Sequence, residues 1–285
     1  MDSLNKVILV TGASSGFGML SALTLAEHHR VYATVRSLDK AKDLQEAFQK
    51  LGRSLSICEM DVTKLDSISR VLAQIETEQG RLDVLINNAG YALAGFFEDL
   101  SEDEIREQFE SNFFGLQSVT RLALPLLRRS SGPQSEGRII NISSIAGLTG
   151  TPFLGAYNAS KWAVEGFSES LYFELLPFHI RVLLIEPGAY KTKIFNQNVR
   201  VAKGSESESS VYLAMTEHIS HLIQTKVRPR LGNPDRVASF IAHCAIKKNP
   251  RFRYILGGDA RLRLWAKRLL PFSIYSRLIR FALSI

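Results

Sequence analysis

Cysteine is scarce in this sequence. Only Cys58 and Cys244 occur among 285 residues, and neither has CxxC spacing or a nearby pair of histidines. That pattern excludes a disulfide-stapled fold and argues against a zinc site. We therefore expect two buried free thiols and no bound metal.

Long apolar runs are also missing. Nowhere do roughly 20 consecutive apolar residues occur, so no transmembrane helix is indicated. The start of the chain, MDSLNKVILVTG, has an apolar run only from Val7 to Val10, which is too short for a secretory signal. These absences predict a cytoplasmic protein.

Acidic residues are outnumbered by basic ones, 28 against 35, which gives a formal net charge of +7. The excess gathers near the end of the chain, and no nucleic-acid-binding motif accompanies it, so nucleic acid is not an expected partner.

The last segment, 261–285, mixes basic and apolar residues. We interpret it as a basic amphipathic extension, with two alternatives open. It either covers the fold and contacts another subunit, or touches a membrane surface. The first is favoured, because Pro271 interrupts a helix there and no nearby cysteine could carry a lipid.

The rest of the chain alternates between apolar strands and amphipathic helices. Because the strands are continuously apolar, they predict a parallel sheet covered by helices on both faces. We expect one α/β domain over 1–260, a Rossmann-type doubly wound sheet of about seven strands that binds its ligand at the strands' carboxyl ends. Strands are expected at 7–10, 30–35, 54–59, 84–87, 137–143, 181–186 and 253–256, and helices at 19–29, 38–50, 65–79, 102–129, 157–176 and 234–245.

A glycine-rich turn, TGASSGFG, joins the first expected strand to the first helix. Backbone amides and the positive end of a helix can receive a pyrophosphate in such a turn, and glycine permits the close approach. A turn of this kind is weak evidence alone, but it opens the first strand-helix-strand unit. It predicts a dinucleotide site formed by Gly12, Ser14, Ser15, Gly16, Phe17 and Gly18.

The end of the second strand bears on the choice of nicotinamide cofactor. NAD-binding sites usually place a carboxylate there to hold both ribose hydroxyls. This chain has Val35 and Arg36 instead, and a guanidinium can bind a 2′-phosphate. Unless Arg36 is simply a solvated turn residue, the pattern favours NADP(H) and leaves use of NAD(H) open.

Tyr157 and Lys161 stand four residues apart in an expected helix, so both face the same side. Such a pair alone is more often a solvated helix face. Ser144, however, follows an apolar strand and therefore lies at the sheet's ligand-binding edge. A phenol, an ammonium and a hydroxyl are thus expected close together.

These motifs, TGxxxGxG, NNAG, YxxxK and a late PG, resemble the short-chain dehydrogenase/reductase family in its short form. The resemblance implies hydride transfer between a nicotinamide and an alcohol or carbonyl, with Tyr157 as acid/base. Lys161 would stabilise the phenolate and bind the nicotinamide ribose, and Ser144 would orient the substrate oxygen. Asn112 would link Lys161 to solvent through water.

The resemblance also implies further cofactor contacts. Asp61 and Val62 would lie beside the adenine, and the loop Asn88, Ala89, Gly90 would lie along the cofactor. The backbone of Pro187 and Gly188, with Thr192, would contact the carboxamide. Each motif alone could be an ordinary turn.

The closest resemblance is to 17β-hydroxysteroid and retinol dehydrogenases, which implies a small lipophilic substrate and a homodimer or homotetramer. A substrate lid is expected at about 190–230, and 203–210 within it is polar and expected to be mobile. A noncatalytic NADP(H)-binding sensor on the same fold is the alternative function. Residues that flank the catalytic motifs could form an apolar pocket or merely pack in the core: Leu148, Phe153, Leu154, Tyr190 and Phe195.

Overall fold

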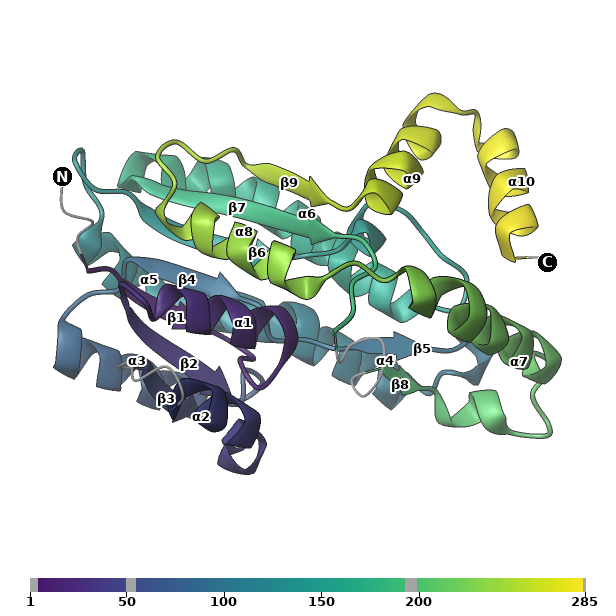
Figure 1. Ribbon diagram of the computed structural model, residues 1–285, viewed down its shortest axis with the longest axis horizontal. Helices are drawn as coiled ribbons and strands as arrows, with labels where there is room; N and C mark the ends of the chain where they lie inside the picture. The colour runs from purple at the N-terminus through teal and green to yellow at the C-terminus, as the bar shows by residue number, and fades with distance from the viewer. Residues whose placement is uncertain (1–4, 50–54, 193–198, 284–285) are drawn as a thin grey trace.

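The computed structural model describes residues 5–49, 55–192 and 199–283. Seven parallel strands form the main sheet, in the order β3-β2-β1-β4-β6-β7-β9 (Figure 1). The expected single-domain doubly wound fold is confirmed. The strands are β1 (Val7–Val10), β2 (Arg30–Val35), β3 (Leu55–Glu59), β4 (Val84–Asn87), β6 (Gly137–Ile142), β7 (Ile180–Pro187) and β9 (Arg253–Leu256).

Helices cover both faces of this sheet, because the strands present apolar side chains to each face in turn. In β1, Ile8 and Val10 pack in one core cluster, whereas Val7 and Leu9 pack in another. The first cluster is covered by α1 (Gly16–Leu25), α2 (Lys42–Gln49) and α8 (Pro234–Ile246). The second is covered by α3 (Leu65–Gln79), α5 (Gly115–Ser130) and α6 (Gly155–Leu175). Figure 1 shows α1 and α8 in front of the sheet and α5 and α6 behind it.

The strand order reverses between β1 and β4. From β1 the chain builds outward through β2 and β3, then returns to the other side of β1 for β4. The loops after these two central strands therefore diverge and leave a crevice at their carboxyl ends.

The helix expected over 102–129 is interrupted. It divides into α4 (Glu102–Phe109), a π-helical turn (Glu110–Phe114) and α5. The wider turn contains Asn112, whose buried side chain binds the backbone of Tyr91 instead of following the helix surface. The helix expected over 102–129 therefore runs from Glu102 to Ser130 with this wider turn inside it.

A second, two-stranded sheet pairs β5 (Ala92–Ala94) with β8 (Val199–Val201). The polar stretch 203–210, expected to be mobile, follows β8 and contacts the segment 98–104. The backbone amide of Lys203 donates to Glu104 Oε1 at 3.1 Å, and Ser210 Oγ donates to Asp99 Oδ1 at 2.6 Å. Helix α7 (Leu213–Leu222) then begins.

The chain finishes with α9 (Gly258–Leu269) and α10 (Phe272–Leu283), which separate at Pro271 as predicted. They extend from the end of the molecule to which β7 and β9 point (Figure 1). In the described part of the chain, none of the helices combines the length and apolar character that a membrane span needs.

Candidate active site

A cleft of about 860 Å³ opens in the crevice at the carboxyl ends of β1 and β4. Most of the residues predicted to bind a cofactor line it, although they come from five separate segments of the sequence. Those that do are Gly12, Ser14, Ser15, Gly16, Phe17, Arg36, Asp61, Val62, Asn88, Ala89, Gly90 and Thr192.

The glycine turn fits the phosphates of a dinucleotide. Gly12 has a φ of +67°, and a Cβ there would lie 2.7 Å from Ala89 Cα. Gly16 has a φ of +58° and faces Thr192. Ser15 precedes α1 without capping it through its side chain, so the first amides of the helix are available to an anion.

The loop after β4 is fastened to this turn. Thr11 Oγ1 accepts from the backbone amides of Asn88 and Ala89, both at 2.9 Å. Asn88 Nδ2 donates in return to the carbonyls of Thr11 and Gly12 at 3.0 and 2.9 Å. These bonds hold the two sides of the crevice together. The role of Thr11 was not predicted, because its contacts join segments 77 residues apart.

Two cations stand where β2 ends. Arg36 and Lys40 both line the cleft, whereas Asp61 is engaged locally by Thr63, whose amide and hydroxyl donate to Asp61 Oδ1 at 3.0 and 2.8 Å. Sequence reasoning missed Lys40, which lies in the short 3-10 helix Leu38–Ala41 after β2.

Besides Tyr157 and Lys161, three predicted cofactor residues do not line the cleft. Gly18 packs behind it, where a Cβ would clash with Asn88 Nδ2. Pro187 is the last residue of β7, and Gly188 packs against the carboxylate of Asp259.

The catalytic candidates gather next to this cleft without lining it. Tyr157 and Lys161 are buried one turn apart on α6, and Lys161 Nζ lies 5.9 Å from the centroid of the Tyr157 ring. Ser144 follows β6, and its hydroxyl lies near enough to the Tyr157 phenol to lower the pKa of that phenol. Tyr91 lines the cleft, and the next residue, Ala92, packs against Tyr157.

Burial shifts the pKa of both α6 residues. It raises the pKa of Tyr157, which the hydrogen bond from Ser144 partly opposes. Burial lowers the pKa of Lys161 to about 8, against the attraction of the Glu165 carboxylate. Lys161 Nζ also donates to the carbonyl of Ile142 at 2.8 Å, which fixes its position at the end of β6. A neutral phenol therefore stands beside a readily deprotonated ammonium.

Asn112 connects the loop after β4 to α6. Its Oδ1 accepts from the Tyr91 amide at 3.0 Å, and its Nδ2 donates to the Tyr91 carbonyl at 3.0 Å and to Ser160 Oγ at 3.1 Å. Ser160 immediately precedes Lys161. These contacts bring Asn112 to the catalytic group.

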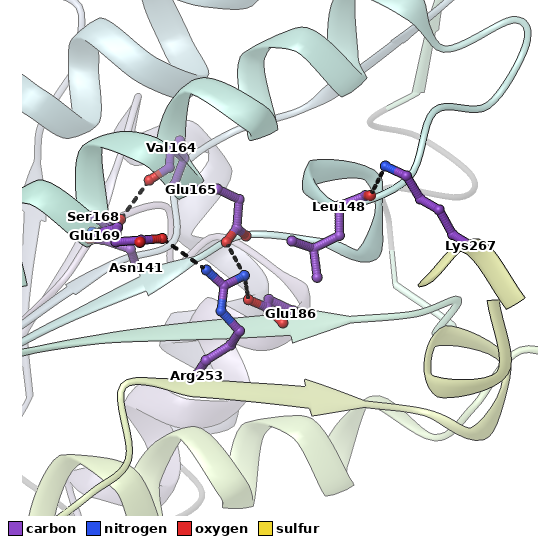
Figure 2. A network of polar contacts seen from close by, with 9 residues as sticks. All are labelled: Asn141, Leu148, Val164, Glu165, Ser168, Glu169, Glu186, Arg253 and Lys267. Atoms are coloured by element: carbon purple, nitrogen blue, oxygen red, sulfur yellow. Dashed lines mark hydrogen bonds and ion pairs between the residues drawn. The ribbon is translucent and has the colours of Figure 1, made fainter. Parts of the chain in front are cut away.

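A buried pair of carboxylates lies one helical turn beyond Lys161 (Figure 2). Arg253 Nη1 on β9 donates to Glu165 Oε2 on α6 and to Glu186 Oε1 on β7, both at 2.7 Å. Burial raises the pKa of Glu165, and burial with repulsion from Glu165 raises that of Glu186 to about 8. Burial of two carboxylates this close together favours a proton shared by the pair. Sequence analysis missed this pair, although Glu186, a glutamate inside an apolar strand, could have revealed it.

The expected pocket residues divide between two environments. Leu154 packs against Tyr157, and Phe153 packs with Ile219 of α7. Leu148 packs instead towards α9, and Tyr190 packs on Phe17, with ring centroids 5.8 Å apart. Phe195 lies outside the described residues.

Comparison with known proteins adds independent information. The family model described as short chain dehydrogenase matches residues 6–202. An uncharacterized oxidoreductase, YusZ of Bacillus subtilis, is 40% identical over 96% of this chain and 97% of its own. A 3-ketodihydrosphingosine reductase of Bacteroides thetaiotaomicron is 38% identical over 88% of each chain. Human retinol dehydrogenase 8 is 39% identical over 68% of this chain and 61% of its own.

Solved structures of short-chain dehydrogenases have the same fold as this chain. A short-chain dehydrogenase from Streptomyces avermitilis superposes with a TM-score of 0.80 at 34% identity, over 99% of this chain and 97% of that one. The RhlG/NADP active-site complex from Pseudomonas aeruginosa gives a TM-score of 0.74 at 25% identity, over 91% and 98%.

Proposed function

The chain belongs to the short-chain dehydrogenase family, and on that premise we propose that it is an NADP(H)-dependent oxidoreductase that interconverts a lipophilic alcohol and its ketone or aldehyde. One observation carries the proposal. Tyr157, Lys161 and the Ser144 hydroxyl meet at the edge of a cleft that fits a dinucleotide.

Each of the three side chains has a distinct task. Reduced nicotinamide, when bound, supplies the hydride. Tyr157 donates its proton to the substrate oxygen as negative charge develops there, and the Ser144 hydroxyl hydrogen-bonds the same oxygen. The Lys161 ammonium stabilises the resulting phenolate. In the opposite direction the phenolate accepts the proton of the alcohol.

The preference for NADP(H) rests on Arg36 and Lys40. Both side chains line the end of the cleft next to β2, and two cations there complement a 2′-phosphate. The name of the RhlG complex, which contains NADP, is consistent with this preference. NAD(H) would bind without that electrostatic gain.

A lipophilic substrate suits the apolar side chains beside Tyr157. Leu154 contacts Tyr157, and Phe153 extends the apolar surface to α7. The names of two relatives, a 3-ketodihydrosphingosine reductase and a retinol dehydrogenase, point to ketones or alcohols on long hydrocarbon chains. The proposed enzyme is a homodimer or homotetramer and is located in the cytoplasm.

We propose that the segment from about 190 to 230 closes over this substrate. Ile219 of α7 packs on Phe153, so movement of α7 would open the apolar surface. Limited proteolysis tests the lid. Cofactor with substrate should slow cleavage near Lys203, and an unchanged cleavage rate would reject closure.

The test of the function is a turnover assay. Oxidation of NADPH and of NADH is followed with a panel of long-chain ketones, retinoids, steroids and short aldehydes. We expect turnover with NADPH and a lipophilic carbonyl. Tight NADPH binding without turnover of any compound would favour the noncatalytic sensor instead.

A further inference from the structure

Helices α9 and α10 bury only a narrow part of their surface. Ala260 and Leu264 are the buried residues of α9, and Tyr275 is that of α10 among the described residues. Pro271 separates the two helices, and Phe272, which follows it, is 80% exposed. Most of the apolar surface of both helices therefore faces away from the protein.

The exposed apolar side chains of α9 form a stripe. An α-helix turns about 100° per residue, so Leu262, Trp265 and Leu269 lie on one side of α9, opposite Ala260 and Leu264. All three are exposed, and Trp265 is 69% exposed. The inner side of α9 thus covers the fold, as expected from the sequence, whereas the outer side has no partner in the described chain.

Helix α10 repeats the arrangement. Ile274, Leu278 and Phe281 recur at helical spacing on one side and are exposed, with Phe281 87% exposed. Arg277 and Arg280 flank this stripe. We call these two stripes the outer face; Phe272, at the bend between the helices, is exposed on the other side of α10.

After Asp259 in the first turn of α9, which accepts from the Ala189 amide, the charge of this segment has a single sign. Residues 260–285 contain six arginine and lysine residues and no aspartate or glutamate. Arg263 and Lys267 point inward, whereas Arg268, Arg277 and Arg280 make no hydrogen bond or ion pair with the described part of the chain. The outer face therefore combines bulky apolar side chains with uncompensated cations.

We propose that the outer face of α9 and α10 docks on an anionic lipid bilayer. Acyl chains would receive the tryptophan, phenylalanine and leucine side chains, and the phosphate groups of the lipids would pair with the arginines. A second copy of this chain fits less well. A two-fold contact would bring the same cations together without any acidic residue to balance them.

The docking surface is joined to the catalytic end of the molecule. Lys267 Nζ donates to the carbonyl of Leu148 at 2.5 Å (Figure 2). It also lies 4.3 Å from the centroid of the Trp162 ring. Arg263 Nη2 donates to the carbonyl of Gly150 at 2.7 Å. Both bonds anchor α9 to the loop between Ser144 and Tyr157.

On the other side, α10 meets α7. The Leu283 carbonyl lies 2.9 Å from Nε2 of His218 on α7. Docking would thus place the bilayer beside both segments that border the catalytic residues. The benefit of this placement for a lipophilic substrate rests on the proposed function. The docking of the outer face on a bilayer does not depend on that function.

Vesicle sedimentation tests the docking. The full-length protein is mixed with vesicles of phosphatidylcholine alone or of an equal mixture of phosphatidylcholine and phosphatidylglycerol. We expect binding to the mixed vesicles that weakens with added salt. Partition should fall at least about tenfold when Trp265, Phe272 and Phe281 are replaced together by serine, and also when Arg268, Arg277 and Arg280 are replaced together by glutamine.

The matched control removes exposed aromatic side chains elsewhere. Phe97→Ser with Phe173→Ser, at positions 79% and 64% exposed, should leave vesicle binding unchanged. Tyr157→Phe should also bind normally, because docking does not depend on the reaction. Absence of binding to mixed vesicles, or an equal loss in the control, would overturn the proposal. A third result would also overturn it: the unmodified protein is a dimer by light scattering and does not bind vesicles, and the triple serine variant is a monomer.

Discussion

Burial sets the protonation of the two residues on which the proposed chemistry depends. It raises the pKa of Tyr157, which keeps the phenol protonated and able to donate. It lowers the pKa of Lys161 to about 8, so the ammonium is readily lost as pH rises. We therefore expect reduction of the carbonyl to lose rate above about pH 8, as the charge that stabilises the phenolate disappears.

Replacing Arg36 and Lys40 together by alanine should change the choice of cofactor. Each lost charge-assisted bond to a phosphate is worth about 1.5–3 kcal/mol. We expect kcat/KM for NADPH to fall on the order of 100-fold and that for NADH to change little. Lys42→Ala is the control, because Lys42 is exposed and does not line the cleft. Equal losses with both cofactors would contradict the assignment.

The buried carboxylate pair should make stability depend on pH. The raised pKa of Glu186, about 8 against 4.5 for an unperturbed side chain, means that the folded protein binds more protons than the unfolded chain between these values. The free energy of unfolding should therefore fall as pH rises through that window. The lowered pKa of Lys161 acts oppositely between about 8 and 10.5.

Glu186→Gln should flatten the first of these slopes, as measured by urea unfolding across the window. Glu169→Gln is the matched control. The Glu169 carboxylate also approaches Arg253, at 3.7 Å, but it is mostly exposed. If Glu186→Gln and the unmodified protein show the same slope, the pair does not hold the extra proton.

Among the elements, the π-helical turn matters most for the site because it places Asn112. In Asn112→Ala, the Tyr91 amide would lose its partner, and the Tyr91 carbonyl and the Ser160 hydroxyl would each keep one of their two bonds, to Gln108 and to the Tyr157 carbonyl. We expect a loss of about 2–3 kcal/mol in unfolding free energy and a lower kcat. Glu110→Ala, at an exposed position of the same turn, should cost less than about 0.5 kcal/mol. Similar losses in both variants would reject a positioning role.

Elements with a strong local pattern were predictable. The bounds of β1, β2, α3, β4 and β9 agree with the sequence predictions. Buried parallel strands are continuously apolar, and α3 has a regular amphipathic period. The π-helical turn inside the helix over 102–130 has no local pattern of its own, because it depends on bonds between Asn112 and Tyr91, 21 residues away in the sequence. The three-residue strands β5 and β8 are too short to show a period.

In the site, too, features with a local sequence pattern were predictable and features that depend on tertiary contacts were not. Glycine turns and the Tyr157–Lys161 spacing have local signatures, and the fold brings them together at one end of the sheet. Proximity in sequence failed for Leu148 and Tyr190, which flank catalytic motifs but pack towards α9 and Phe17. The direction of a side chain depends on tertiary packing. Arg253, which joins β9 to the two carboxylates, was missed for the same reason.

At the scale of the whole molecule, three different surfaces lie near one end of the parallel sheet. The cleft fits a dinucleotide, the surface beside Tyr157 is apolar, and α9 with α10 presents a basic, apolar face outward. The bonds from Lys267 and Arg263 connect that face to the loop beside the catalytic residues.

Kinetics of Tyr157→Phe test the central claim most directly, with the best lipophilic carbonyl of the panel as substrate. The substitution keeps the ring that packs against Ala92 and Leu154 and removes only the hydroxyl. Tyr172→Phe on the same helix is the control. We predict that kcat falls about 100-fold or more in Tyr157→Phe while NADPH binding stays within about twofold. Turnover at the unmodified rate in Tyr157→Phe would show that another group donates the proton and would contradict the account.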